Sequence, residues 1–226
     1  MSVVRAARIG IRSGLAVAAS MLVVFGASWP SSAGAESPNP DVVVVGDSLT
    51  GDNAARIGDR LRSTVPHTVQ LEGLGGRRIE ESYEWLGWRS SGLEAIERVR
   101  AAGIEPELWV IELGTNDLFH FGDRSWAEKV AESRRLIDTV VAAVGPESSI
   151  AWVTVLNRDD AVATRTFNEA LRGRAAANER LALIDWEHTS TVHPEWFIDL
   201  VHPNDAGADV LADIYGAEIE RRLAAH

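Results

Sequence analysis

From residue 41 onward, the chain alternates between short apolar runs and longer segments of mixed polarity. Five nearly continuous apolar runs have the length of a β-strand, a pattern typical of parallel strands buried on both faces. They lie at residues 42–45 (VVVV), 67–71 (HTVQL), 108–113 (LWVIEL), 150–155 (IAWVTV) and 181–185 (LALID). The pattern therefore predicts a sheet of about five strands.

Between these runs, apolar residues recur at the spacing of an amphipathic helix. The predicted helical faces contain Ala54, Ile57 and Leu61; Leu93, Ile96 and Val99; Trp126, Val130, Ile137 and Val141; and Leu211, Tyr215, Ile219 and Leu223. Ser125 and Glu128 have the spacing of a capping box at the start of the third helix. Alternation of strands and helices predicts an α/β fold with a mostly parallel sheet between helical layers.

The first 35 residues have the composition of a secretory signal rather than of the domain. Three arginines, Arg5, Arg8 and Arg12, precede the apolar run GLAVAASMLVVFGA, and Ala33 and Ala35 follow at small-x-small spacing. The alternative is an uncleaved anchor, but the apolar run is shorter than the roughly 20 residues that span a bilayer. We therefore expect residues 1–35 to be a signal peptide cleaved before Glu36, residues 36–40 to be a short polar lead, and residues 41–226 to form one domain of a secreted protein.

Charge and cysteine content narrow the classes of function. The chain has 22 basic and 33 acidic residues; three of the arginines lie in the signal segment, which has no acid, so 19 basic and 33 acidic residues remain. A net charge of −14 argues against nucleic acid or anionic lipid as the main partner. The absence of cysteine excludes disulfides and thiolate chemistry.

Polar residues with catalytic chemistry follow the predicted strands. Ser48 follows the first strand, a glycine-rich turn with Gly76 the second, and Asn116 the third, while Asp199 and His202 precede the last helix. In parallel sheets the ligand site lies beyond the carboxyl ends of the strands. The sequence thus places these residues on one rim of the sheet.

Ester hydrolysis needs this set of groups. A serine becomes nucleophilic when a histidine takes its proton and a carboxylate orients the histidine, while N–H donors stabilise the oxyanion. Ser48 would attack, His202 would be the base and Asp199 would orient it. The backbone N–H groups of Ser48 and Gly76 and the amide of Asn116 would be the oxyanion donors.

Four sequence blocks, GDSLT, the glycine turn, GTND and DLVHP, resemble the SGNH, or GDSL, hydrolases in order and spacing over nearly all of the chain after the signal. The resemblance implies a three-layer α/β/α, flavodoxin-like fold. It also implies ester hydrolysis by the residues Ser48, Gly76, Asn116 and His202, with Asp199 as the acid. Two positions depart from the family pattern: LEGLGG lacks the usual asparagine, which leaves Gly75 and Gly76 open as donors, and Leu200 stands where glycine is frequent.

Other interpretations exist for single residues. Ser48 could cap the helix that follows the first strand, because serine is a preferred N-cap. The histidines and acids between residues 188 and 205 match no zinc spacing, so we expect no metal. Phosphate-loop motifs are absent, and no cofactor is expected. Arg77, beside the glycine turn, could meet an anionic substrate group, although a solvated side chain is the simpler interpretation.

Aromatic residues near the predicted rim are candidates for a substrate pocket. Trp85 and Trp88 follow the glycine turn, and Trp196 and Phe197 precede Asp199. They could form the walls of an acyl or sugar pocket, or could equally pack helices onto the sheet.

Three functions remain in view. The first is a secreted serine hydrolase of small or medium acyl esters, with a small-molecule, lipid or glycan ester as substrate. The second is an acyltransferase in which a sugar hydroxyl replaces water on the same acyl-enzyme. The third is a non-catalytic glycan-binding domain, against which the intact set of catalytic residues argues.

Overall fold

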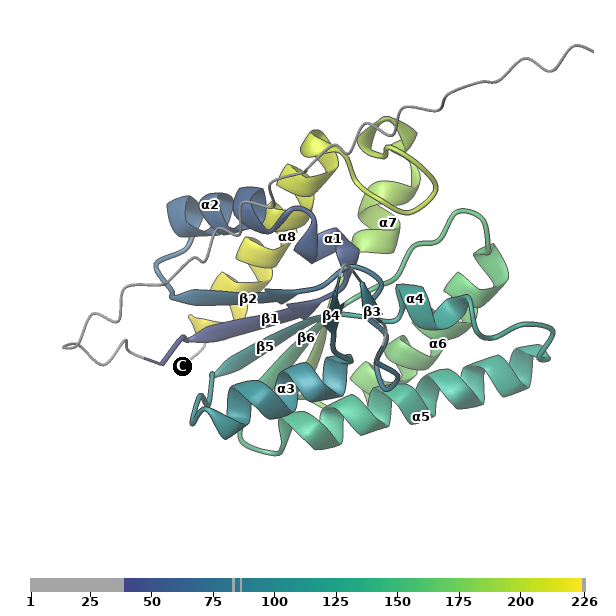
Figure 1. The fold of residues 1–226 in the computed structure, drawn as a ribbon, viewed down its shortest axis with the longest axis horizontal. Coiled ribbons are helices and arrows are strands. Elements are labelled where there is room, and N and C mark those ends of the chain that lie inside the picture. Colours follow the sequence, from purple (N-terminus) through teal and green to yellow (C-terminus); the bar gives the residue numbers. More distant parts are fainter. Residues whose placement is uncertain (1–38, 83, 86, 225–226) are drawn as a thin grey trace, which may run out of the picture. The chain divides into compact units, whose positions relative to one another are not determined.

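The computed structural model describes residues 39–82, 84–85 and 87–224, so the expected signal at residues 1–35 lies outside the described residues. Five parallel strands form one sheet in the order β2-β1-β5-β6-β7 (Figure 1). The strands are β1 (Val42–Gly46), β2 (Val69–Gly73), β5 (Leu108–Glu112), β6 (Ser149–Val153) and β7 (Leu181–Ile184). This is the flavodoxin-like order, whose switch point lies between the first strand and the third strand of the sheet along the chain, β1 and β5. The predicted fold class is confirmed.

Helices flank the sheet on both faces (Figure 1). They are α1 (Ser48–Gly51), α2 (Ala54–Thr64), α3 (Gly92–Ala101), α4 (Thr115–Leu118), α5 (Trp126–Val144), α6 (Ala161–Ala176), α7 (Trp186–Thr191) and α8 (Asp205–Leu223), with a 3₁₀ turn, η1, at Pro194–Trp196. A separate antiparallel pair, β3 (Glu84–Trp85) and β4 (Trp88–Arg89), follows the glycine turn.

The two faces of the sheet have separate apolar cores because neighbouring residues of a strand point in opposite directions. Val43 and Val45 face the layer of α3, α5 and α6, whereas Val42 and Val44 face the layer of α2 and α8. All four side chains are fully buried. The four consecutive valines are therefore explained by a strand at the centre of the sheet that needs apolar groups on both sides.

Several features of the fold differ from the predicted elements, among them a further long helix and the start of β2. Helix α6 was not expected, because its buried face includes Thr166 and Asn168 as well as alanines. Asn168 bonds both the N–H (3.0 Å) and the carbonyl (2.8 Å) of Val155. Strand β2 begins at Val69 rather than at residue 67, since Thr68 turns to bond the Asp41 carboxylate through its N–H at 2.7 Å.

Within the part of the chain that the structure describes, no helix is both long enough and apolar enough to cross a membrane.

Candidate active site

Ser48 is the first residue of α1, directly after β1. The helix is capped by Asp47, whose Oδ1 accepts the backbone N–H of Leu49 at 3.0 Å. Because Asp47 fills the capping role, the Ser48 hydroxyl is not used as a cap. It points toward the histidine, and Ser48 is mostly buried at the floor of a cavity, with 7% of its surface exposed.

The serine, the histidine and the aspartate form one chain of hydrogen bonds. Ser48 Oγ lies 3.1 Å from Nε2 of His202, and Nδ1 of His202 lies 2.7 Å from Oδ2 of Asp199. The other oxygen of Asp199 accepts the backbone N–H groups of Val201 and His202, each at 2.7 Å. Partial burial works to raise the pKa of Asp199, but these N–H donors and the imidazole outweigh it and hold the pKa below its ordinary value. Asp199 is thus kept as the anion beside the ring.

A loop at residues 193–203, here called the histidine loop, contains both Asp199 and His202. Two backbone bonds join its two halves, from Ile198 N–H to the His202 carbonyl at 2.9 Å and from Asn204 N–H, just after the loop, to the Trp196 carbonyl at 2.8 Å. Asn204 also caps α8 by accepting the N–H groups of residues 206 and 207, each at 3.1 Å. The cap of α8 and the backbone bonds of the loop together hold the His202 backbone in position, so that its ring reaches Ser48.

Arg158, which follows β6, holds the histidine loop from the side. Its guanidinium lies 4.3 Å from the ring centre of Phe197 and donates to the Ser190 carbonyl at 2.8 Å. Its backbone N–H donates to the Leu200 carbonyl at 3.1 Å. The Phe197 ring also packs against Trp186, with 5.7 Å between ring centres. Sequence reasoning missed Arg158, because nothing in its local sequence marks a contact with a loop about 40 residues later.

Two of the four aromatic residues proposed for the substrate pocket lie elsewhere. Trp196 stacks on His193 with ring centres 3.8 Å apart, and Phe197 packs beneath the loop. Neither lines the cavity at Ser48, which is bordered by Phe119 and Ile198 instead. The side chains of Trp85 and Trp88 lie outside the described residues, so their predicted role stays a prediction.

Gly75 and Gly76 of the glycine turn line the same cavity as Ser48. The N–H of Arg77 donates to the Leu74 carbonyl at 3.2 Å, and Gly76 has a positive φ of 70°. A positive φ at the third residue defines a type II turn, which favours glycine there. Within the described residues, the N–H groups of Ser48, Gly75 and Gly76 have no protein acceptor. The amide at the centre of the turn belongs to Gly76, which favours Gly76 over Gly75 as the donor.

Asn116, the second residue of α4, lies between the glycine turn and the serine. Its Nδ2 donates to Oδ2 of Asp47 at 2.9 Å and to the carbonyl of Arg77 at 3.2 Å. The next residue, Asp117, accepts the backbone N–H of Ile79 at 3.2 Å instead of bonding its own turn. Burial raises the pKa of Asp117 to about 7.

Asp47 and Glu112 form a buried acidic pair behind the serine. Glu112 Oε2 accepts the backbone N–H of Asp47 at 3.0 Å and the hydroxyl of Thr50 at 3.1 Å, and that hydroxyl lies 3.3 Å from the hydroxyl of Tyr215. Burial raises the pKa of Asp47 to about 6, against the lowering effect of the Leu49 N–H and of Glu112. Burial, and then the neighbouring Asp47 charge, raises the pKa of Glu112 well above its ordinary value. Glu112 therefore keeps its proton while Asp47 ionises.

The cavity at Ser48 has a volume of about 510 Å³. Its lining consists of Ser48, Asp52, Gly75, Gly76, Arg78, Asn116, Phe119, His120, Ile198 and His202. Phe119 and Ile198 are 59% and 72% exposed, so they present apolar surface at the mouth.

Arg77, for which a solvated side chain was the simpler interpretation and contact with an anionic substrate group the alternative, does not line this cavity. Arg77 is buried, and its Nη1 donates to the carbonyls of Gly46, at 3.0 Å, and Glu72. Burial lowers its pKa to about 10. Arg77 is neither solvated nor free to meet a ligand, because it satisfies carbonyl groups at the carboxyl ends of β1 and β2. The next residue, Arg78, lines the cavity instead.

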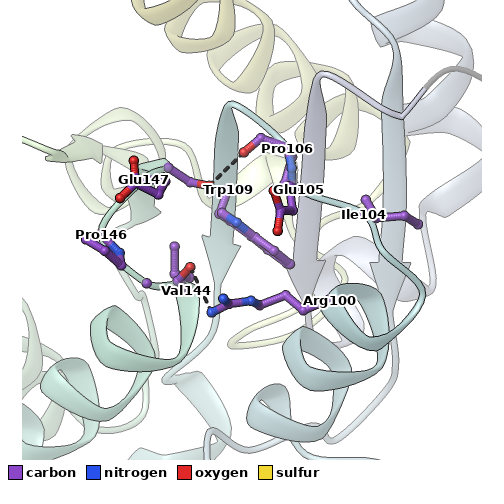
Figure 2. Close-up of a pocket in the computed structure, with 10 residues that line it drawn as sticks. Arg100, Ile104, Glu105, Pro106, Trp109, Val144, Pro146 and Glu147 are labelled. Atoms are coloured by element: carbon purple, nitrogen blue, oxygen red, sulfur yellow. Dashed lines mark hydrogen bonds between the residues drawn. The ribbon is translucent and has the colours of Figure 1, made fainter.

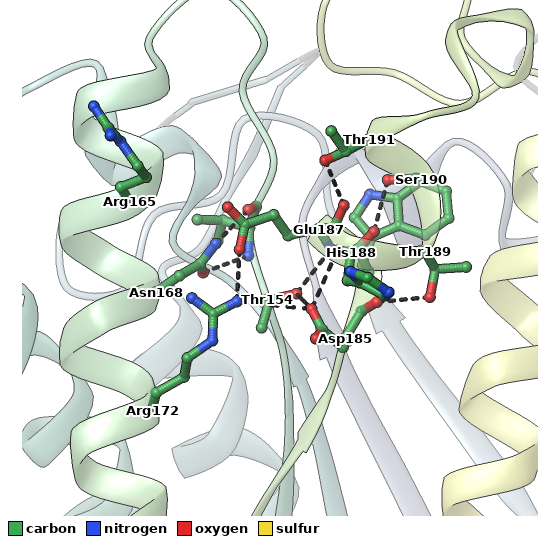
Figure 3. A network of polar contacts seen from close by, with 12 residues as sticks. Thr154, Arg165, Asn168, Arg172, Asp185, Glu187, His188, Thr189, Ser190 and Thr191 are labelled. Carbon is green, nitrogen blue, oxygen red and sulfur yellow. Dashed lines mark hydrogen bonds and ion pairs between the residues drawn. The ribbon is translucent and has the colours of Figure 1, made fainter.

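Two other polar features support the fold, one at each end of the strands. At the amino-terminal ends of β5 and β6, a cavity of about 60 Å³ is lined by Arg100, which donates to the carbonyl of Val144 at 3.2 Å and so ties α3 to the end of α5 (Figure 2). At the ends of β6 and β7, Thr154 donates to Asp185 at 3.1 Å and accepts the N–H of Glu187 at 2.8 Å (Figure 3). That second network fixes α7, which leads into the histidine loop.

Across the described ranges, no group of three histidine, aspartate or glutamate side chains is arranged to hold a metal ion.

Comparison with known proteins identifies the class. The family model of the GDSL-like Lipase/Acylhydrolase family matches residues 33–210, and the chain belongs to this family. No curated protein matches the sequence.

Solved structures share the fold at low sequence identity. The C-terminal catalytic domain of the peptidoglycan O-acetyltransferase A of Streptococcus pneumoniae is 17% identical, with a TM-score of 0.62 over 82% of this chain and 95% of that one. The lipase/acylhydrolase of Enterococcus faecalis is 20% identical, with a TM-score of 0.61 over 80% and 95%. A lipolytic protein of the G-D-S-L family from Veillonella parvula is 18% identical, with a TM-score of 0.61 over 80% and 98%.

Proposed function

We propose that this protein is a serine ester hydrolase that cleaves small or medium acyl esters through an acyl-enzyme. The observation that carries the proposal is the chain of hydrogen bonds from Ser48 through His202 to Asp199 at the floor of an open cavity. Family membership supports an acyl-transfer reaction, either hydrolysis or transfer to another acceptor.

In the first half of the reaction, the Ser48 oxygen attacks the ester carbonyl carbon and its proton passes to Nε2 of His202. The carbonyl oxygen becomes an oxyanion and accepts the N–H groups of Ser48 and Gly76 and the amide of Asn116. The longer bond of Asn116, to the Arg77 carbonyl at 3.2 Å, is the one that the oxyanion replaces. The ester C–O bond then breaks, and His202 returns the proton to the departing alcohol.

In the second half, water attacks the acyl-enzyme. His202 takes a proton from the water, the oxyanion forms again on the same donors, and the bond to Ser48 breaks as the serine oxygen regains its proton. The product is a carboxylic acid, and the enzyme returns to its starting state. No cofactor enters these steps.

The cavity favours short acyl groups. Its volume is about 510 Å³, and the large apolar side chains that line it, Phe119 and Ile198, are mostly exposed at its open mouth rather than buried in a deep apolar channel. Activity on p-nitrophenyl esters of increasing acyl length tests this proposal, and we expect turnover to fall beyond short chains. Faster hydrolysis of long-chain than of short-chain esters would contradict it.

An acyltransferase with the same residues is the second candidate, because the open mouth gives an alcohol the same access as water. The fold is shared with the Streptococcus pneumoniae O-acetyltransferase domain. Product analysis with an added alcohol separates the two: transfer yields a new ester, whereas hydrolysis yields only the acid.

We also propose that the protein acts outside the cytoplasm after cleavage before Glu36. The arginine-rich start, the short apolar run and the small residues at 33 and 35 support this. Sequencing the amino terminus of the exported protein should find Glu36 at or near the first position. Intact residues 1–35 on membrane-bound protein would indicate an anchor.

A further inference from the structure

The proposed mechanism distinguishes the two sides of the catalytic cavity. When the ester bond breaks, Nε2 of His202 donates its proton to the alcohol oxygen, so the alcohol lies on the His202 side. The carbonyl oxygen lies on the opposite side, toward Gly76 and Asn116. Residues beside His202 therefore contact the alcohol portion of the substrate.

A second cavity continues the catalytic cavity on the His202 side. It has a volume of about 570 Å³ and shares two lining residues, Asp52 and Ile198, with the catalytic cavity. The rest of its lining comes from Asn53 and residues 203–206, which directly follow His202. This second cavity, here called the alcohol-side cavity, is open to solvent at the surface of the molecule and has room for an alcohol larger than a simple alkyl group.

The boundary between the two cavities is formed by a carboxylate and an aliphatic side chain. Asp52 is exposed, and within the described residues its carboxylate has no hydrogen-bond or ion-pair partner. The other acidic residue that lines the alcohol-side cavity, Asp205, is already paired with Arg56 at 2.6 Å. Asn53 donates its Nδ2 to the Leu49 carbonyl at 3.0 Å, which leaves its Oδ1 to accept. Ile198 presents a largely exposed apolar surface.

This combination suits a polyol. Hydroxyl groups donate to carboxylate and amide oxygens, while the C–H groups of a polyol or sugar pack against Ile198 and Pro203. A long alkyl alcohol would place apolar surface against the Asp52 carboxylate and remove water from it without a replacement hydrogen bond.

We propose that the alcohol-side cavity binds the polyhydroxylated alcohol portion of the substrate, with Asp52 accepting hydrogen bonds from its hydroxyl groups. Asp52 is then a specificity-determining residue for the alcohol, and the natural substrate is an ester of a polyol. This inference rests on the proposed ester hydrolysis, because the mechanism assigns the alcohol to the His202 side.

The test compares esters that share an acetyl group and differ in the alcohol. Values of kcat/KM are measured for 6-O-acetylglucose and for ethyl acetate, and their ratio cancels any effect on acetyl transfer itself. Wild-type protein should prefer 6-O-acetylglucose. Asp52→Ala should lower the ratio by about tenfold or more, the size expected for loss of a hydrogen bond to a charged group. Asp52→Asn, which keeps one acceptor oxygen, should lower it less.

Asp59→Ala is the matched control. Asp59 lies on the exposed surface of α2, paired with Arg62, so its removal changes the net charge equally without touching either cavity. Its ratio should equal that of the wild type. Circular dichroism of each variant checks that the fold is intact.

An unchanged ratio in folded Asp52→Ala would overturn the inference. So would a larger loss with acetylcholine than with 6-O-acetylglucose, because Asp52 would then select a cation. Wild-type hydrolysis of ethyl acetate and p-nitrophenyl acetate without turnover of 6-O-acetylglucose would also overturn it, yet leave ester hydrolysis in place. Failure with every ester would instead contradict the proposed function itself.

Discussion

Replacing Asp47 with asparagine should disturb the Asn116 amide, one of the proposed oxyanion donors, while leaving the Ser48 side chain unchanged. Asp47 is fully buried, and its two oxygens accept from different donors: Oδ1 from the Leu49 N–H at 3.0 Å, and Oδ2 from the Asn116 amide at 2.9 Å. An asparagine side chain has only one acceptor oxygen. In either orientation its own NH₂ group must face one of these donors, which then loses its bond.

The size of the effect follows from the unpaired donor. Leaving a buried donor without an acceptor costs about 1–3 kcal/mol. If this displaces the Asn116 amide from the oxyanion, kcat should fall about 5- to 150-fold. The upper bound is complete loss of one oxyanion donor, which costs about a hundredfold to a thousandfold. KM should change little, because the charge on the oxygen develops only in the transition state.

The assay measures kcat and KM on p-nitrophenyl acetate at pH 8, above the pKa of about 6 that burial gives Asp47. It includes Asp47→Asn, Asn116→Ala and the double variant. Because Asp47 acts through Asn116, the double variant should lose little more than Asn116→Ala alone. Multiplication of the two separate losses would refute the argument, as would a wild-type kcat in Asp47→Asn.

Two further predictions concern the histidine loop and the pH dependence of stability. Arg158→Met removes the contact with Phe197 and the side-chain bond to the Ser190 carbonyl of α7, and should lower kcat about tenfold or more; Arg165→Met, which loses a contact with Trp126 at 5.6 Å, is the control and should retain activity. Burial raises the pKa of Asp117 to about 7 from 3.8, so the folded state holds this proton where the unfolded state has lost it. The free energy of unfolding therefore falls as pH rises through that interval. Asp117→Asn should gain stability relative to wild type between pH 4 and pH 8, by up to about 4 kcal/mol in urea unfolding; a constant difference would contradict the assignment.

Much of the fold could be predicted from the sequence because the central strands of the sheet are buried on both faces. The valines of β1 and the apolar run of β5 have no polar face, and that is the pattern of central parallel strands. Helix α6 escaped prediction because Thr166 and Asn168 are polar residues on its buried face. Their side chains bond carbonyl and N–H groups of the protein, so local periodicity alone does not show that they are buried.

The positions of the candidate catalytic residues could be predicted from the ends of the strands. Ser48 and Asn116 follow adjacent strands, and parallel strands bring these ends together. The walls of the cavity could not be predicted in this way. Whether Trp196 or Ile198 faces the cavity depends on how the histidine loop closes and on Arg158, contacts that join segments far apart in the chain. The catalytic roles of these residues stay predictions.

The most direct test of the account is the rate of ester hydrolysis by Ser48→Ala. The variant removes the oxygen that lies 3.1 Å from His202 and leaves the rest of the site in place. Measured on p-nitrophenyl acetate with purified, folded protein, kcat should fall by at least about a thousandfold, and Ser48→Ala combined with His202→Ala should be little worse, because the two residues act as a unit. Turnover by Ser48→Ala at a rate near that of the wild type would contradict the assignment of Ser48 as the nucleophile.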